Sequence, residues 1–201
     1  MVNFYTVTIF LIIYFICSIN PAIEICKRKT GEDIRKLGSG NAGSANAMRV
    51  LGRILGTVVV LLDIAKVFLA YYIAGFVSKL FGNNPDDQIF ASILILAAVI
   101  GQCFPIYYGL RGGKGVIVGI TVISILDPKN ALICALAGLV VLIFTRTPSK
   151  ATLSGLLLYI IISVVMGYKY LVPILISSAI IMYKHRQSIY RILTKQENKI
   201  R

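Results

Sequence analysis

The sequence predicts an all-α integral membrane protein with seven transmembrane helices, and its composition is the first reason. Hydrophobic residues make up 57% of the 201 positions and charged residues only 14%, with a mean hydropathy of +0.82. Soluble domains are roughly 45–50% apolar and about 25% charged. The apolar residues also form long runs, several of them near the ~20 residues that a membrane-spanning helix needs. These two features exclude a soluble globular domain, a disordered chain and a disulfide-rich secreted protein.

The apolar runs divide the chain into seven helical segments, which we assign to one domain, residues 1–201. The first three segments are as long as a bilayer-spanning helix, and the last two are shorter but strongly apolar. A turn signal from Asp127 to Asn130 separates the fourth and fifth. Both are short for a full crossing, so we expect a short middle hairpin. In order, the segments are residues 4–25, 54–77, 88–108, 115–126, 131–144, 153–168 and 170–183.

Basic residues are distributed over the loops in a way that predicts orientation. The formal net charge is +13, and the loops after the first, third and fifth segments and the C-terminal tail are all basic. Because basic loops stay in the cytoplasm, we expect the N-terminus outside and the C-terminus inside. The same charge suits anionic lipid or an anionic substrate. No nucleic-acid-binding motif accompanies it, so we expect no nucleic-acid partner.

A polar loop follows the first segment and is rich in glycine, serine and asparagine. Glycines allow positive φ and let backbone N–H groups approach a ligand, and a helix starting near residues 42–45 would present its N-terminal amides to an anion. This arrangement suits a phosphate. The alternative is a turn whose polar groups satisfy one another. The candidate ligands in this loop are Gly38, Ser39, Gly40, Asn41, Asn46 and Arg49.

A second glycine-rich loop lies between the third and fourth segments. Lys114 opens the next helix and could hold a phosphate, while Gly112 and Gly113 clear space for it. The loop is not a P-loop, because Gly115 follows the lysine where serine or threonine is required. The alternative is an interfacial basic turn, which explains the cations but not the glycines.

Ionisable and hydroxyl side chains at three other places complete the candidate set. Asp63 and Lys66 lie inside the second apolar run, three residues apart, where a mutual ion pair competes with ligand contact. His185 stands in a basic tail that is either a helix on the anionic leaflet or a proton-carrying segment. Ser149 belongs to a weaker hydroxyl set. Scattered acids and one histidine predict no metal site.

These motifs resemble a known family, the PlsY-type acyl-phosphate:glycerol-3-phosphate acyltransferases of bacteria. Residues 38–52 resemble the family pattern G-S-G-N-x-G-[AS]-x-N-x-x-R-x-x-G, and residues 63–67 resemble D-x-x-K-G. Residues 101–116 resemble G-H-x-[FY]-P-x-[FY]-x-x-x-x-G-G-K-G-V, and the tail resembles H-R-x-N-I-x-R. The motifs occur in the family order along nearly the whole chain.

The resemblance implies a seven-helix enzyme of the bacterial inner membrane whose site faces the cytoplasm. Such an enzyme transfers a fatty acyl group from acyl phosphate to the 1-hydroxyl of glycerol 3-phosphate, without a cofactor. Its partners are these two substrates, membrane lipid and a peripheral enzyme that makes acyl phosphate. The residues implied in catalysis are Ser39, Arg49, Gln102 and Lys114. Those implied in binding substrate or phosphate are Gly38, Gly40, Asn41, Asn46, Lys66, Gly112, Gly113, Ser149, His185 and Ser188.

The chain departs from the family pattern at several of these positions. Gln102 stands where the family has histidine, Val67 where it has glycine, and Ser188 where it has asparagine. Glutamine donates and accepts hydrogen bonds but carries no proton at neutral pH. The alternative hypothesis is therefore a divergent paralogue, with a different acceptor or with a binding or regulatory role. A small anion transporter would explain the spans and basic loops but not the motif order.

Overall fold

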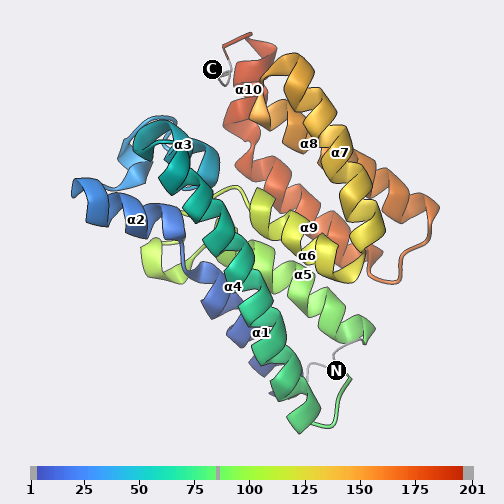
Figure 1. The fold of residues 1–201 in the computed structure, drawn as a ribbon. Coiled ribbons are helices and arrows are strands. Elements are labelled where there is room, and N and C mark those ends of the chain that lie inside the picture. Colours follow the sequence, from blue (N-terminus) through green and yellow to red (C-terminus); the bar gives the residue numbers. More distant parts are fainter. Residues whose placement is uncertain (1–3, 85–86, 197–201) are drawn as a thin grey trace.

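The computed structural model describes residues 4–84 and 87–196, which form helices joined by loops, with no strand among them (Figure 1). The predicted all-α class is confirmed. The longer helices run in alternating directions along the chain in Figure 1. The elements are α1 (Phe4–Ser18), α2 (Pro21–Thr30), η1 (Ile34–Lys36), α3 (Ser44–Leu51), α4 (Arg53–Leu80), α5 (Gln88–Cys103), η2 (Ile106–Tyr108), α6 (Val116–Leu126), α7 (Pro128–Thr145), α8 (Pro148–Val165), α9 (Leu171–Lys184) and α10 (Arg186–Leu193).

Five apolar segments within the described residues are long and apolar enough to cross a membrane. They are α1 together with α2, α4, α5 together with η2, α7, and α8; α6 and α9 are apolar but shorter. Large hydrophobic side chains on the outer faces of these helices are exposed, such as Phe76 on α4 and Ile143 on α7. An apolar outer surface of this kind is what lipid requires, so the chain is a multi-pass membrane protein.

The first segment is broken where the sequence predicted one run over residues 4–25. Helix α1 ends at Ser18, and α2 begins at Pro21, whose ring removes a backbone donor from the helix. The side chain of Asn20 accepts a hydrogen bond from the Ile23 N–H (3.1 Å) and donates one to the Ala42 carbonyl (3.1 Å). The break therefore turns the chain towards the first glycine-rich loop.

The middle hairpin is less symmetric than predicted. Helix α6 is short, at 11 residues, but α7 has 18 and extends beyond the expected 131–144 at both ends. Pro128 occupies its first turn, and the Asp127 side chain accepts from the Asn130 N–H. Proline suits the first turn because its missing N–H has no partner there anyway. The turn signal is thus part of the helix start.

Glycines allow close packing at two helix contacts that shape the site. A Cβ at Gly138 of α7 would lie 3.0 Å from the Ala151 carbonyl oxygen of α8, and one at Gly155 would lie 3.0 Å from the Cys134 carbonyl oxygen. Small residues let membrane helices approach in this way. Helix α3 starts at Ser44, within the range predicted, and gathers with α2 and α10 at one end of the bundle (Figure 1).

Candidate functional site: two polar cavities and an apolar groove

The first glycine-rich loop is shaped by Asn46. Its Oδ1 accepts from the Ser39 N–H (2.8 Å), and its Nδ2 donates to the carbonyls of Ile34 (3.3 Å) and Leu37 (3.0 Å). Gly38 has a φ of +57°, and a Cβ there would lie 2.4 Å from Asn46 Oδ1. Only glycine fits so tight a left-handed position without strain. Gly38 and Asn46 therefore hold the loop in shape.

The second glycine-rich loop lies against the first. The Gly113 N–H donates to the Gln102 carbonyl (3.1 Å), and a Cβ at Gly113 would lie 2.7 Å from the Ala42 carbonyl oxygen. A Cβ at Gly112 would lie 2.2 Å from the Gln102 carbonyl oxygen. The two glycines thus permit close backbone approach, and the next residue, Lys114, reaches the cavity walls.

Arg35 of η1, which the sequence analysis did not single out, holds the second loop against the segment that precedes the first. Its Nη1 donates to the carbonyls of Tyr108 (2.7 Å) and Arg111 (3.0 Å). Its Nε and Nη2 donate to the two carboxylate oxygens of Asp33. The hydrogen-bonded guanidinium lowers the pKa of the Asp33 carboxyl below its ordinary 3.8. This Asp33–Arg35 clamp fixes the second loop relative to η1.

Beneath the loops, Asp63, Lys66 and Gln102 form a buried cluster. Lys66 Nζ lies 2.7 Å from Asp63 Oδ1, donates to Gln102 Oε1 and donates to the Ile19 carbonyl (2.6 Å). Gln102 Nε2 donates to Asp63 Oδ2 (3.4 Å). Lysine has three N–H groups, and three oxygens surround them here. The mutual ion pair predicted as one alternative is the observed arrangement. Both of its residues lie in α4, and Gln102 joins the pair to α5.

The smaller polar cavity, of about 130 Å³, lies between the first loop, Lys114 and α10. Four cations line it, and Lys114 Nζ donates to Ser188 Oγ (2.6 Å). Such a ring of cations suits a doubly charged phosphate. Its polar lining residues are Ser39, Asn41, Asn46, Arg49, Lys114, Ser149, Lys184, Gln187, Ser188 and Arg191.

The larger polar cavity, of about 250 Å³, adjoins the smaller one and shares Asn41, Lys114 and Ser149 with it. His185 lines the larger cavity, with Nδ1 2.8 Å from the Ile181 carbonyl oxygen. That contact needs a proton on Nδ1, which in the neutral ring leaves the lone pair on Nε2. The other polar side chains in the wall are Ser44, Asp63, Gln102 and Thr152.

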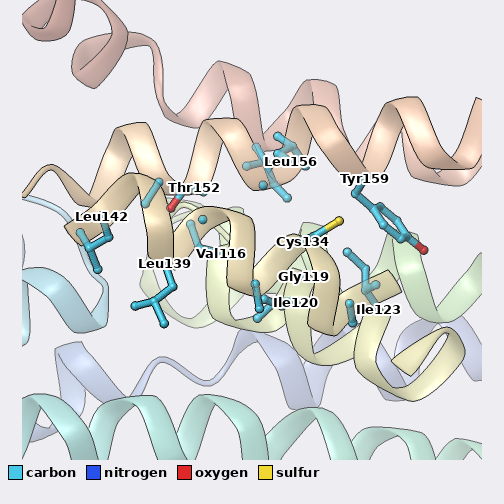
Figure 2. Close-up of a pocket in the computed structure, with 16 residues that line it drawn as sticks. Val116, Gly119, Ile120, Ile123, Cys134, Leu139, Leu142, Thr152, Leu156 and Tyr159 are labelled. Carbon is cyan, nitrogen blue, oxygen red and sulfur yellow. The ribbon is translucent and has the colours of Figure 1, made fainter. Parts of the chain in front are cut away.

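An apolar groove of about 300 Å³ continues from the larger cavity between α6, α7 and α8 (Figure 2). Val116, Leu142 and Thr152 line both, so the two spaces meet at these residues. Leu142 and Tyr159 lie at opposite ends of the side chains labelled in Figure 2. The sequence analysis missed this groove. The available signal was the row of small residues Ala131, Ala135 and Gly138 on α7.

The structure brings most of the predicted site residues to these two polar cavities and leaves four outside their walls. Gly38, Gly112 and Gly113 shape the loops, and Lys66 belongs to the buried cluster. Four residues that the sequence analysis left out of the assigned site also line a cavity. Lys184, Gln187 and Arg191 belong to the basic tail, and Thr152 belongs to the weaker hydroxyl set. Within residues 4–84 and 87–196, no three His, Cys, Asp or Glu side chains gather as metal ligands would. The predicted residues in the walls are Ser39, Gly40, Asn41, Asn46, Arg49, Gln102, Lys114, Ser149, His185 and Ser188.

Chemically, the arrangement combines cation-lined cavities with a groove for a hydrocarbon chain. It can hold a molecule with a phosphate at one end and an apolar tail at the other. With that molecule in the larger cavity and the groove, the smaller cavity can hold a second anion. Positioning and charge are what the side chains of the two cavities can supply.

The chain is also similar in sequence to proteins of known name. The glycerol-3-phosphate acyltransferase of Halalkalibacterium halodurans is 36% identical over 194 residues, covering 93% of this chain and 91% of that protein. That of Aquifex aeolicus is 34% identical over 195 residues, covering 95% and 98%.

Two crystal structures of PlsY (YgiH), an integral membrane glycerol 3-phosphate acyltransferase, have the same fold. The glycerol 3-phosphate form matches with a TM-score of 0.86 at 32% identity, covering 98% of this chain and 96% of that one. The lysophosphatidic acid form matches with a TM-score of 0.82 at 30% identity, covering 98% and 95%. The family model described as "Glycerol-3-phosphate acyltransferase" matches residues 7–195. With nearly its whole length matched, this chain belongs to the glycerol-3-phosphate acyltransferase family.

Proposed function

We propose that this protein transfers a fatty acyl group from acyl phosphate to the 1-hydroxyl of glycerol 3-phosphate. The products are lysophosphatidic acid and inorganic phosphate. One observation carries the proposal: two adjoining polar cavities, both lined by Lys114, lead into an apolar groove of about 300 Å³. The glycerol 3-phosphate and lysophosphatidic acid forms of the PlsY structures support the acceptor and the product.

The cavities divide the substrates by chemistry. Glycerol 3-phosphate is small and polar, and we assign its phosphate to the smaller cavity, among Arg49, Lys184 and Arg191. The donor has a long apolar tail, and we assign that tail to the groove, with its phosphate in the larger cavity. Lys114 lines both cavities and so faces both phosphates. A single lysine between two anions offsets their repulsion and brings the reacting groups together.

The protein does not need to activate the acyl donor for this reaction. Acyl phosphate is a mixed anhydride, so its carbonyl is already activated. The acceptor hydroxyl oxygen bonds to the carbonyl carbon, the bond to the phosphate oxygen breaks, and phosphate leaves. Asp63 is the one carboxylate in the described walls, and its oxygens face Lys66 and Gln102. We therefore assign the hydroxyl proton to a substrate phosphate.

Cationic and hydroxyl side chains stabilise the negative charge that develops in the transition state. Lys114, with Ser188 as its hydrogen-bond partner, faces the leaving phosphate, and Ser39 and Arg49 face the acceptor. Gln102 lines the larger cavity and also accepts from Lys66 and donates to Asp63. Removing one donor that stabilises developing charge typically costs about 10²–10³ in rate.

We also propose seven membrane crossings, with the N-terminus outside and the cavities open to the cytoplasm of a bacterial cell. The basic loops support this orientation, because the cation-lined cavities lie among α3, α10 and the second loop. On this side the protein meets soluble glycerol 3-phosphate. A peripheral enzyme that makes acyl phosphate is the partner that supplies the donor.

Purified protein in lipid, given palmitoyl phosphate and glycerol 3-phosphate, tests the proposal. We expect phosphate and lysophosphatidic acid in equal amounts. Phosphate release without lysophosphatidic acid would mean hydrolysis, and would contradict the assigned acceptor. Neither product from folded protein would favour the divergent paralogue. Ser39→Ala should lower acyl transfer by about tenfold or more. Ser154→Ala is its control, because the Ser154 hydroxyl donates to the Ala151 carbonyl and is absent from the described cavity walls.

A further inference from the structure

We propose that Tyr159 sets the length of the acyl chain that the enzyme prefers, by closing the far end of the apolar groove. This inference rests on the proposed function, since it assigns the groove to the donor's tail. It adds a specificity-determining residue that no motif of the sequence contains.

The groove has a defined mouth and a defined end. The mouth is the set of residues shared with the larger polar cavity, including Leu142 and Thr152. Along α7 the lining runs from Leu142 back to Ala131, which at the helical rise is roughly 16 Å. Helices α7 and α8 run antiparallel and touch where Gly138 faces Ala151 and Gly155 faces Cys134. Continuing that register places Tyr159 level with the start of α7.

Tyr159 fills this end with a rigid ring. It is 2% exposed and packs edge-on against Tyr168, with ring centroids 6.4 Å apart. Beyond it, Tyr168 donates to Asp127, and Asn130 donates to Asp127 and Tyr168. A hydrocarbon tail gains nothing from entering a polar cluster of this kind. The ring therefore separates the apolar groove from the polar loops at the opposite end of the bundle.

A second, smaller cavity that Tyr159 also lines shows what removal of the ring would open. This space of about 30 Å³ lies between α5, α6 and α9 and is lined by Tyr159 as well. It shares Gly119, Ile123 and Leu156 with the main groove. Truncating Tyr159 would join the two spaces and extend the apolar path inward. Each further methylene that is buried against an apolar wall tightens binding of the chain by roughly fourfold.

The test is the chain-length profile of kcat/KM, measured with decanoyl, lauroyl, myristoyl, palmitoyl and stearoyl phosphate. For the wild type we expect kcat/KM to rise with length until the groove is full and then to level or fall. Tyr159→Ala should raise the ratio of the stearoyl to the palmitoyl value by about tenfold, because these two chains differ by two methylenes. Tyr159→Phe keeps the ring and should keep the wild-type profile.

Because loss of a buried ring can prevent folding, Ala131→Phe tests the same end from α7. Ala131 lines the groove there, and a larger side chain should shift the preference towards shorter chains. An unchanged profile in Tyr159→Ala, or in Ala131→Phe if the first variant does not fold, would overturn the role of Tyr159 while leaving acyl transfer intact. A wild type that is inactive with every donor would overturn the proposed function itself.

Discussion

The polar cavities and the apolar groove differ in how their walls are held. Around the cavities, hydrogen bonds hold the two loops: Asn46 fixes the shape of the first loop, and Arg35 of η1 bonds to the second. The groove has no such network in its described walls; close helix packing at Gly138 and Gly155 holds it. One region is therefore sensitive to lost hydrogen bonds and charges, and the other to added or removed volume. Substitutions of each kind separate the two regions.

The largest effect is expected below the cavities, at Lys66→Met. The substitution keeps the length of the side chain but leaves the Asp63 carboxylate buried without its cation. Breaking a buried pair in this way costs about 3–5 kcal/mol. We expect a markedly lower Tm in detergent, with little change in the KM for glycerol 3-phosphate of the protein that remains folded. The double variant Asp63→Asn/Lys66→Met should recover much of the Tm. An unchanged Tm with a raised KM would instead make Lys66 a substrate ligand.

Next in size is the loss of the shared cation in Lys114→Ala. Because Lys114 lines both polar cavities, we expect kcat/KM to fall by about 10²-fold with no loss of membrane expression or Tm. Lys150→Ala is the matched control, since Lys150 is an exposed lysine outside the described cavity walls. Equal activity of the two variants would contradict the assigned role of Lys114.

Filling the groove in Ala135→Phe should have a more selective effect. Ala135 lines the groove and its neighbour Leu136 is 52% exposed on the outer face. We expect the KM for palmitoyl phosphate to rise by about tenfold, because several methylenes lose an apolar wall. The KM for glycerol 3-phosphate should not change, and Leu136→Phe should match the wild type. A rise in both KM values would mean that the cavities and the groove are not separate regions.

A small effect is expected for Gln102→His. One ring nitrogen of a neutral histidine can accept from Lys66, so the shorter of the two side-chain contacts of Gln102 is kept. We expect kcat/KM within roughly threefold of the wild type, since only the 3.4 Å hydrogen bond to Asp63 is lost. Gln102→Leu removes both contacts and should lose more. A clear loss in Gln102→His would show that the site depends on the amide.

The smallest effect is expected at the Asp33–Arg35 clamp. A lowered pKa means that the ionised Asp33 stabilises the fold above its ordinary pKa of 3.8, and that this contribution disappears as the pH falls through the lowered pKa. Both side chains are partly exposed, so the gain at neutral pH is about 0.2–1 kcal/mol. We expect Asp33→Asn to lower the Tm slightly at neutral pH and not in strong acid. A Tm difference that persists in strong acid would rule out the charge as its cause.

Much of the helical fold and of the polar site could be predicted from the sequence. Apolar runs locate the helices because a bilayer demands length and hydrophobicity, which are local properties. The glycine-rich loops and Lys114 were likewise visible as short patterns. The break at Pro21 was not predicted, because an apolar run does not show how proline divides it. The early start of α7 at Pro128 was not predicted either, because the residues that cap this helix also form a turn signal.

The remaining features depend on contacts between distant segments. Lys184 and Arg191 appeared as part of a basic tail, and only the fold brings them to Ser39 and Arg49. The groove could not be predicted from the sequence, because Ala135 and Gly138 look like the small residues found in any membrane helix. Whether a small residue faces lipid, a neighbour or a cavity is decided by α6 and α8. The role of Tyr159 could not be predicted for the same reason, because the sequence does not show what its ring packs against.

A structure with a non-hydrolysable palmitoyl phosphonate bound would test the central claim most directly, namely that one continuous path holds both ends of the donor. We predict the phosphonate beside Lys114 in the larger polar cavity, and the chain between α6, α7 and α8 with its end at Tyr159. A chain lying elsewhere on the bundle, with the groove empty, would contradict the account.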